Sequence, residues 1–135
     1  MKSLFPALIL MLAFGSLFVT SAQEETAQTI NVRVGKQKKA SRSKITIKFV
    51  SLIEDSRCPE GTNCVWAGNA KIKVSLKLDD DAAVISEMNT NLGAKGTNCG
   101  SYAVYLTSLT PTPNANVRIN RNAYTATFSI TRLSR

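Results

Sequence analysis

Apolar and polar residues alternate along several short segments of this chain. The clearest run covers residues 71–78, where Ile72, Val74, Leu76 and Leu78 would point inward and three lysines outward. A period of two is typical of a strand with one buried face. Lysines on the outer side of such a strand also suggest a protected sheet edge. Shorter alternation predicts further strands at 29–34, 44–49, 83–88, 101–109 and 122–131, with 117–119 as a short strand or connector.

Interruptions between these runs predict turns, loops and one irregular strand. The apolar phase shifts by one at Val50, as one extra residue in a β-bulge would cause. The run Asp79-Asp80-Asp81 favours a hairpin turn, because it lacks the spaced oxygens and glycine of a calcium loop. Residues 89–100 are rich in Asn, Gly and Thr and predict a loop, and the prolines of 110–114 stop the strand before them.

The count is six or seven short strands with turn signals between them and no useful helical periodicity. This pattern predicts an antiparallel immunoglobulin-like β-sandwich, with a small β-barrel as the alternative fold.

The first 22 residues differ from the rest and have the pattern of a cleaved signal peptide. Lys2 precedes an almost wholly apolar run over 4–19, and Thr20-Ser21-Ala22 provides a small-residue cleavage site. We therefore expect a secreted or periplasmic protein with a flexible segment at 23–28 and a single domain at 29–135. No cysteine follows the cleavage site, which argues against a lipid anchor, and no later apolar run is long enough to span a membrane.

Positive charge exceeds negative charge, with a formal net charge of +8. Residues 36–44 form a solvated loop or hairpin end that holds five cations: Lys36, Lys38, Lys39, Arg42 and Lys44. A polyanion-binding patch is the functional alternative to a merely solubilising surface. Aromatic residues that could stack on bases are absent from this segment, so we expect no nucleic acid partner.

The three cysteines allow one disulfide and leave one thiol. The three alternative pairings are Cys58–Cys64, Cys58–Cys99 and Cys64–Cys99. We favour Cys58–Cys64, because Pro59 and Gly61 between them favour a tight reversal of the backbone. Closing so short a loop would stabilise the fold by about 2–3 kcal/mol. Cys99 would then be buried and inert or would link two chains, so we expect a monomer with a Cys99-linked dimer as the alternative.

The stretch 54–69 surrounds these cysteines and holds the candidate binding residues Asp55, Arg57 and Trp66. Asp55 would accept hydrogen bonds from backbone N–H groups or pair with Arg57, or else contact a ligand. Arg57 could stack on Trp66 or bind an anionic partner. For Trp66 we expect core packing against the disulfide. Gly68 would allow a close backbone approach or a positive φ.

Enzymatic chemistry has little support in this sequence. Histidine is absent, which removes the usual nucleophile–base pairs and most zinc sites. No glycine-rich phosphate loop and no Gly-x-Ser-x-Gly elbow are present. We therefore expect no catalytic residue, no metal and no cofactor.

The run Asp55-Ser56-Arg57-Cys58-Pro59, followed by Cys64-Val65-Trp66-Ala67-Gly68, resembles the signature of an uncharacterised family of small exported bacterial β-proteins. That family carries Asp-Ser-Arg-Cys-Pro, a short variable loop and Cys-x-Trp-x-Gly before a strand. Residues 102–106 and 111–113 and Tyr124 are similar to its C-terminal half. The resemblance implies an exported β-domain and no particular activity, and Cys99 is not part of the pattern.

The function that we predict is a non-enzymatic binding or structural module that uses its disulfide-loop end to contact an unknown protein or an anionic surface ligand. Two alternatives stay open. One is a protease inhibitor that presents residues 60–63 of the Cys58–Cys64 loop as a rigid substrate mimic. The other is a polyanion binder that uses the basic segment 36–44.

Overall fold

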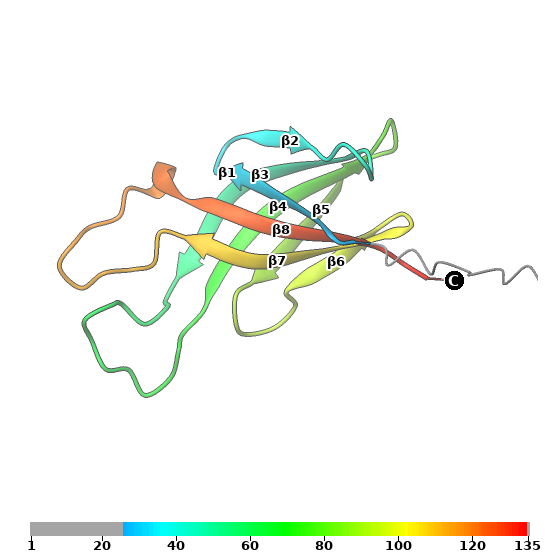
Figure 1. Cartoon of the computed structure of the whole chain (residues 1–135). Helices are drawn as coiled ribbons and strands as arrows, with labels where there is room; N and C mark the ends of the chain where they lie inside the picture. The colour runs from blue at the N-terminus through cyan, green and yellow to red at the C-terminus, as the bar shows by residue number, and fades with distance from the viewer. Residues whose placement is uncertain (1–25, 135) are drawn as a thin grey trace, which may run out of the picture.

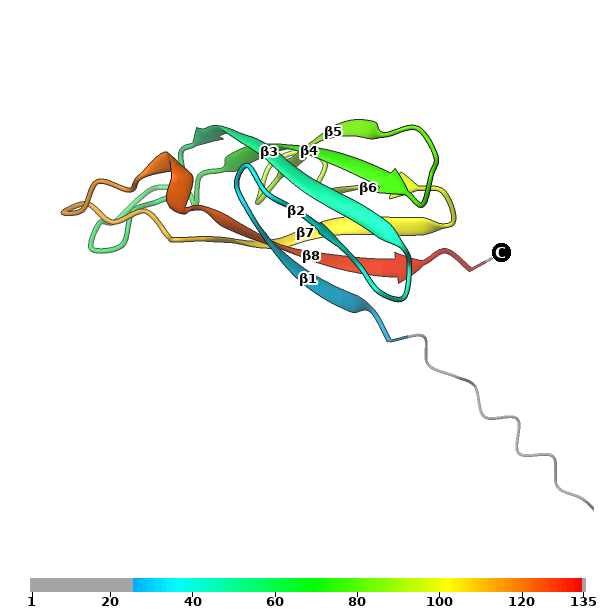
Figure 2. The same cartoon turned by 90° about the horizontal axis from the view of Figure 1, so that it is seen from above.

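The structure is a computed structural model, and it describes residues 26–134. Two antiparallel four-stranded sheets face each other (Figures 1 and 2). We call them the β8 sheet and the β4 sheet after a central strand of each. In spatial order, the β8 sheet contains β1 (Gln28–Arg33), β8 (Thr125–Arg132), β7 (Tyr102–Thr110) and β6 (Gly96–Cys99). The β4 sheet contains β2 (Gln37–Lys39), β3 (Ile45–Asp55), β4 (Ala70–Leu78) and β5 (Val84–Asn89).

The predicted β-sandwich is therefore confirmed, and the sheets are not closed into a barrel. The predicted signal peptide lies outside the described residues. Across residues 26–134, no helix has the length and hydropathy needed to cross a membrane. One short 3₁₀-helix, η1 (Arg121–Ala123), precedes β8.

The core lies between the two sheets and is built from the alternating positions. Residues 72, 74 and 76 of β4 are fully buried, as are Phe49 of β3 and Phe128 of β8. The inward side chains predicted for the last strand, Tyr124, Ala126, Phe128 and Ile130, are all buried. Burial of these apolar surfaces supplies the main driving force for folding.

The structure has eight strands instead of six or seven, because two predicted loops each contain a short strand. β2 lies within 36–44 and β6 within 89–100, and both are edge strands. All three residues of β2 are exposed, so no apolar pattern marks it. The edge position suggested for 71–78 is wrong, since β4 lies between β3 and β5. Its lysines mark the outer face of the sheet and not its edge.

The predicted irregularity in β3 is confirmed. The pairing of β3 with β4 shifts register between Phe49 and Ser51 and again between Leu52 and Glu54. The predicted turn at Asp79-Asp80-Asp81 is confirmed as well, since it connects the paired strands β4 and β5.

Three long connections meet at one end of the sandwich, which we call the loop end. They are residues 56–69 between β3 and β4, 90–95 between β5 and β6, and 111–124 between β7 and β8. Strand pairing places them together, because Asp55 pairs with Ala70, Lys71 with Asn89, and Thr110 with Thr125. Figure 1 shows the first and third loops projecting side by side beyond the sheets.

Candidate functional site at the loop end

The Cys58–Cys64 disulfide is present, with Cα atoms 5.9 Å apart, so the favoured pairing is confirmed. Inside the ring, the Thr62 backbone N–H and hydroxyl both donate to the carbonyl of Pro59, at 3.3 and 2.7 Å. Gly61 has a φ of +82° at the third position of this turn, where glycine is the favoured residue. The ring is therefore folded as a tight turn.

This ring is attached to the neighbouring loop 111–124 through its backbone. The Glu60 N–H donates to the carbonyl of Pro113 at 2.8 Å, and the Ala115 N–H donates to the carbonyl of Glu60 at 3.3 Å. The tips of two loops that are distant in sequence thus support each other at the loop end. This contact gives the ring a fixed position relative to β7 and β8.

Beneath the ring, Asp55 and Arg57 form a bidentate ion pair with little exposure to solvent. Arg57 Nε donates to Asp55 Oδ1 and Arg57 Nη2 donates to Asp55 Oδ2, both at 2.8 Å. The Arg57 backbone N–H also donates to Oδ1 at 3.3 Å, and the Tyr124 hydroxyl donates to Oδ2 at 2.8 Å. The two side chains are 8% and 11% exposed.

The remaining guanidinium donors bind the end of β7. Arg57 Nη1 donates to the carbonyl of Leu109 at 2.6 Å, and Nη2 donates to the carbonyl of Pro111 at 2.8 Å. Asp55 and Arg57 thus connect the end of β3 to the end of β7 and to both ends of loop 111–124. Asp55 accepts from a backbone N–H and pairs with Arg57, as predicted, and both side chains make these hydrogen bonds within the fold. A ligand-binding role for either residue stays a prediction.

This arrangement shifts the pKa values of two groups in opposite directions. Burial alone raises the pKa of Asp55, but hydrogen bonds from Arg57 and Tyr124 and the Arg57 charge outweigh it and hold the pKa below its ordinary value. Burial raises the pKa of Tyr124, and its bond to the Asp55 carboxylate raises it further. At neutral pH Asp55 is therefore ionised and Tyr124 is protonated.

A second buried network is formed by Asn69 and was not predicted from the sequence. The Asn69 carbonyl accepts from the N–H and the hydroxyl of Ser56, at 2.7 and 2.9 Å. Its side chain donates to Asn89 at 2.9 Å and accepts from the N–H groups of Asn91 and Leu92, at 3.0 and 3.1 Å. This asparagine therefore joins loop 56–69 to loop 90–95, and no local pattern in the sequence indicates it.

Trp66 is 58% exposed, so the prediction that it packs in the core is wrong. Its neighbour Val65 is fully exposed. The reason is that β4 begins only at Ala70, so both residues still belong to the loop and no buried strand face is available to them. Arg57 directs its guanidinium to Asp55 and two carbonyls. The loop end therefore presents an aromatic and an aliphatic side chain on a disulfide-closed loop.

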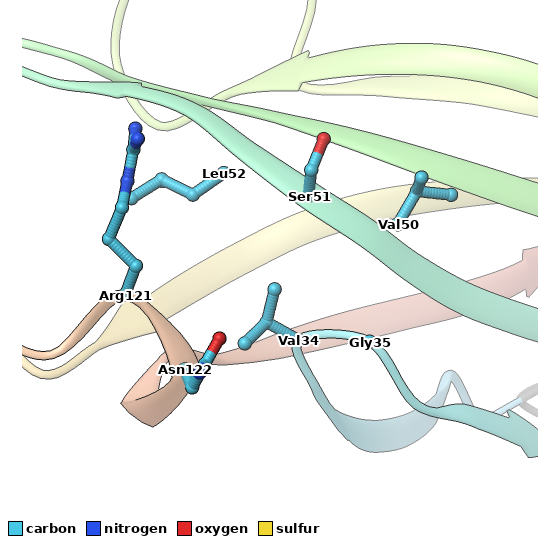
Figure 3. A pocket seen from close by; sticks show the side chains of 7 residues that line it. All are labelled: Val34, Gly35, Val50, Ser51, Leu52, Arg121 and Asn122. Atoms are coloured by element: carbon cyan, nitrogen blue, oxygen red, sulfur yellow. The ribbon is translucent and has the colours of Figure 1, made fainter.

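A cleft of about 290 Å³ lies beside η1, and Cys58, Cys64 and Trp66 do not line it (Figure 3). It is lined by Val34, Gly35, Val50, Ser51, Leu52, Arg121 and Asn122. Figure 3 shows the Arg121 side chain reaching from η1 towards Leu52 of β3. Arg121 is the one ionisable side chain of this lining, so the cleft contains no acid–base pair. In residues 26–134, no group of three or more acidic or cysteine side chains could hold a metal ion.

The basic segment 36–44 runs along one half of β3 in the structure. Lys36 lies next to Phe49, midway along β3, whereas Lys44 lies at the end opposite the loop end. Both Lys39 and Lys44 approach Asp79, at 3.5 and 3.9 Å, and this acid partly neutralises them. Polyanion binding by this segment stays a prediction.

Cys99 is 4% exposed and is not in a disulfide. Burial raises the pKa of this thiol, and the nearby Asp81 carboxylate raises it further, so little reactive thiolate forms. We expect Cys99 to react with a thiol reagent such as Ellman's reagent only after denaturation, when one thiol per chain should appear. Rapid labelling of the native protein, or a disulfide-linked dimer on a non-reducing gel, would contradict this inert role.

No protein-family model matches the chain, and searches of curated proteins and of solved structures found no match either.

Proposed function

We propose that this chain is an exported, non-enzymatic binding module that inserts Trp66 into an apolar pocket of a partner protein. The observation that supports this most directly is the exposure of Trp66 beside the fully exposed Val65, on a loop closed by a disulfide. Tryptophan is among the residues that contribute most to binding energy at interfaces. A tryptophan with more than half of its surface in solvent is well suited to that role.

The shape of this site favours a protein over a small ligand. Small molecules bind in concave pockets, and neither Val65 nor Trp66 lines the described cleft, which borders residues 121–122 on the other side of loop 111–124. The ring projects from the loop end instead, so the concave surface must belong to the partner. Its fixed geometry also favours binding, since the disulfide and the contact with loop 111–124 reduce the entropy lost on association.

The same geometry makes a substrate-mimicking protease inhibitor the weaker proposal. A residue stretch that occupies a protease cleft in the manner of a substrate must lie extended. Here residues 60–62 are folded back on Pro59, and the backbone of Glu60 is already bonded to loop 111–124. A protease panel remains a direct check on this alternative.

The test of this proposal uses Trp66 both as the mutated residue and as the probe. The mature protein is immobilised to capture partners from the exported fraction, and the affinity of each captured protein is then measured with purified components. Trp66→Ala should weaken binding by about 30-fold or more, the loss of a hot-spot residue. Because Trp66 is the chain's single tryptophan, its fluorescence should also shift to the blue as the partner buries it.

Ile85→Ala provides the matched control, because Ile85 is 60% exposed but lies on β5, away from the loop end. This variant should bind within about twofold of the unmodified chain. Both variants should retain the wild-type stability to within about 0.5 kcal/mol, as substitutions at exposed sites do. If no captured protein discriminates between the two variants, or if Trp66 fluorescence is unchanged in the complex, the proposal is wrong.

A further inference from the structure

Lysines occupy the outer face of the β4 sheet in a regular arrangement. Along β4, residues 70, 72, 74 and 76 point into the core, so Lys71, Lys73 and Lys77 point outward. Lys48 of β3 faces the same side, since it pairs with Ser75, an outward residue of β4. Four cations on two adjacent central strands therefore share one surface, which we call the lysine face.

The neighbours of these lysines compensate only part of their charge. Thr46 and Ser75, the residues paired with Lys77 and Lys48, are hydroxyl side chains. Two carboxylate residues lie opposite lysines of β4: Glu87 of β5 pairs with Lys73, and Glu54 of β3 pairs with Lys71. Among residues 26–134, however, none of the four lysines forms an ion pair.

The opposite outer surface of the sandwich has a different chemical character. Thr125, Thr127, Ser129 and Thr131 of β8 alternate with buried residues and therefore point outward, and all four are uncharged hydroxyl side chains. A net positive charge that served only solubility would not need to gather on one sheet. The central strand β8 thus has no outward cation over 125–131, whereas the central strand β4 has three, and this contrast motivates the search for an anionic ligand of the lysine face.

We infer that the lysine face binds a linear polysaccharide that carries sulfate or phosphate groups. From Lys71 to Lys77 the lysine face extends for roughly 20 Å along β4 at about 3.4 Å per residue, and it is only two strands, about 10 Å, wide. A long, narrow distribution of point charges matches a chain of anionic groups that runs along the strand. The proposed site shares no residue with the basic segment 36–44 and does not depend on Trp66.

Two other anionic partners fit this surface less well. A flat membrane would approach the whole sheet, whereas the four lysines lie on only two of its four strands. A single-stranded nucleic acid usually needs aromatic side chains for base stacking, and β4 offers only lysine and serine on this face. Both partners serve as outcomes in the experiment.

The experiment compares two triple variants that remove the same amount of charge. The face variant is Lys48→Gln, Lys73→Gln and Lys77→Gln. The control variant, Lys95→Gln, Arg118→Gln and Arg132→Gln, removes three exposed cations that lie outside β2–β5. Binding to heparin, a sulfated linear polysaccharide, is measured by titration calorimetry over a range of salt concentrations around 0.1 M.

We expect the face variant to lose about tenfold or more in heparin affinity and the control variant to stay within about threefold. The slope of log affinity against log salt should become shallower by roughly 2–3 in the face variant, because binding through three fewer lysines releases fewer counterions. Trp66→Ala should bind heparin as the unmodified chain does, so failure here and failure of the loop-end proposal are separate results.

Three results would overturn the inference. Equal losses of heparin affinity in both triple variants would show that only overall charge matters. No loss of affinity in either variant would show that the lysine face does not bind heparin. The unmodified chain could also bind phosphatidylserine vesicles or single-stranded DNA more strongly than heparin and lose that binding in the face variant. That result would assign the lysine face to a membrane or to a nucleic acid instead.

Discussion

Replacing Gly68 by alanine should destabilise the folded chain by about 3–5 kcal/mol, a loss reserved for substitutions that no small adjustment can relieve. Gly68 has a φ of +71°, and a Cβ at this position would overlap the carbonyl oxygen of Ser56 and lie 2.8 Å from the Cα of Arg57. Both obstacles are backbone atoms, so a side-chain rotation cannot remove the clash. Urea-induced unfolding at neutral pH measures the loss.

The matched control is Gly35→Ala, because Gly35 has almost the same φ, +75°, and no atom lies within 4 Å of the place that an alanine Cβ would take there. It should lose only the cost of a left-handed alanine, about 1–2 kcal/mol. The difference between the two variants isolates the close approach of Gly68 to Ser56 and Arg57, at the two ends of loop 56–69. If Gly68→Ala and Gly35→Ala are equally stable, the two backbone segments are not packed as described.

The strands that form the core could be predicted from the sequence, because one buried face requires an apolar residue at every second position. β4 and β8 alternate without interruption, and the phase shift in β3 coincides with an observed register shift. The edge strands β2 and β6 were missed, because their residues pair through backbone groups and contribute almost no apolar side chains. Backbone pairing of this kind does not require apolar residues, so it cannot be predicted from a hydrophobic pattern.

The loop end could be predicted only where its chemistry is local. Pro59 and Gly61 favour a turn within a few residues, so the Cys58–Cys64 ring was accessible to sequence reasoning. The contact between Asp55 and Tyr124 spans 69 positions, and it exists only because β3 and β8 lie in facing sheets. The exposure of Trp66 was missed for a related reason: the average tendency of tryptophan to be buried says nothing about where a strand starts.

The hydrogen-bonded group of Asp55, Arg57 and Tyr124 should account for a large part of the stability at the loop end. We expect Asp55→Asn to lower the free energy of unfolding by roughly 3 kcal/mol at neutral pH, because it leaves a nearly buried guanidinium without its carboxylate. Glu54→Gln is the control, since Glu54 is the adjacent acid but is exposed; it should change stability by at most about 0.5 kcal/mol. Urea unfolding of both variants measures the difference.

The effect of Asp55→Asn should depend on pH in a definite direction. The pKa of Asp55 is lower in the folded chain than its ordinary value of 3.8, so the folded state binds a proton less readily than the unfolded state. Its stabilisation is therefore complete above the ordinary value and disappears as pH falls through the lowered value. The stability difference between the unmodified chain and Asp55→Asn should shrink over that acidic range. A difference that stays constant down to about pH 2 would mean that the carboxylate charge contributes nothing.

Tyr124 should produce the opposite dependence at alkaline pH. Its pKa is raised above the ordinary value of 10.0, so the folded state holds the phenolic proton more tightly than the unfolded state does. The resulting stabilisation is complete below pH 10.0 and is lost as pH rises through the raised value. The informative quantity is the stability of the unmodified chain minus that of Tyr124→Phe, because the subtraction isolates the contribution of the Tyr124 hydroxyl. This difference should be about 1.5–3 kcal/mol near neutral pH, as for a hydrogen bond to a charged group, and should decrease at alkaline pH. If it instead stays level through the alkaline range, Tyr124 does not donate its hydroxyl proton to Asp55 in solution.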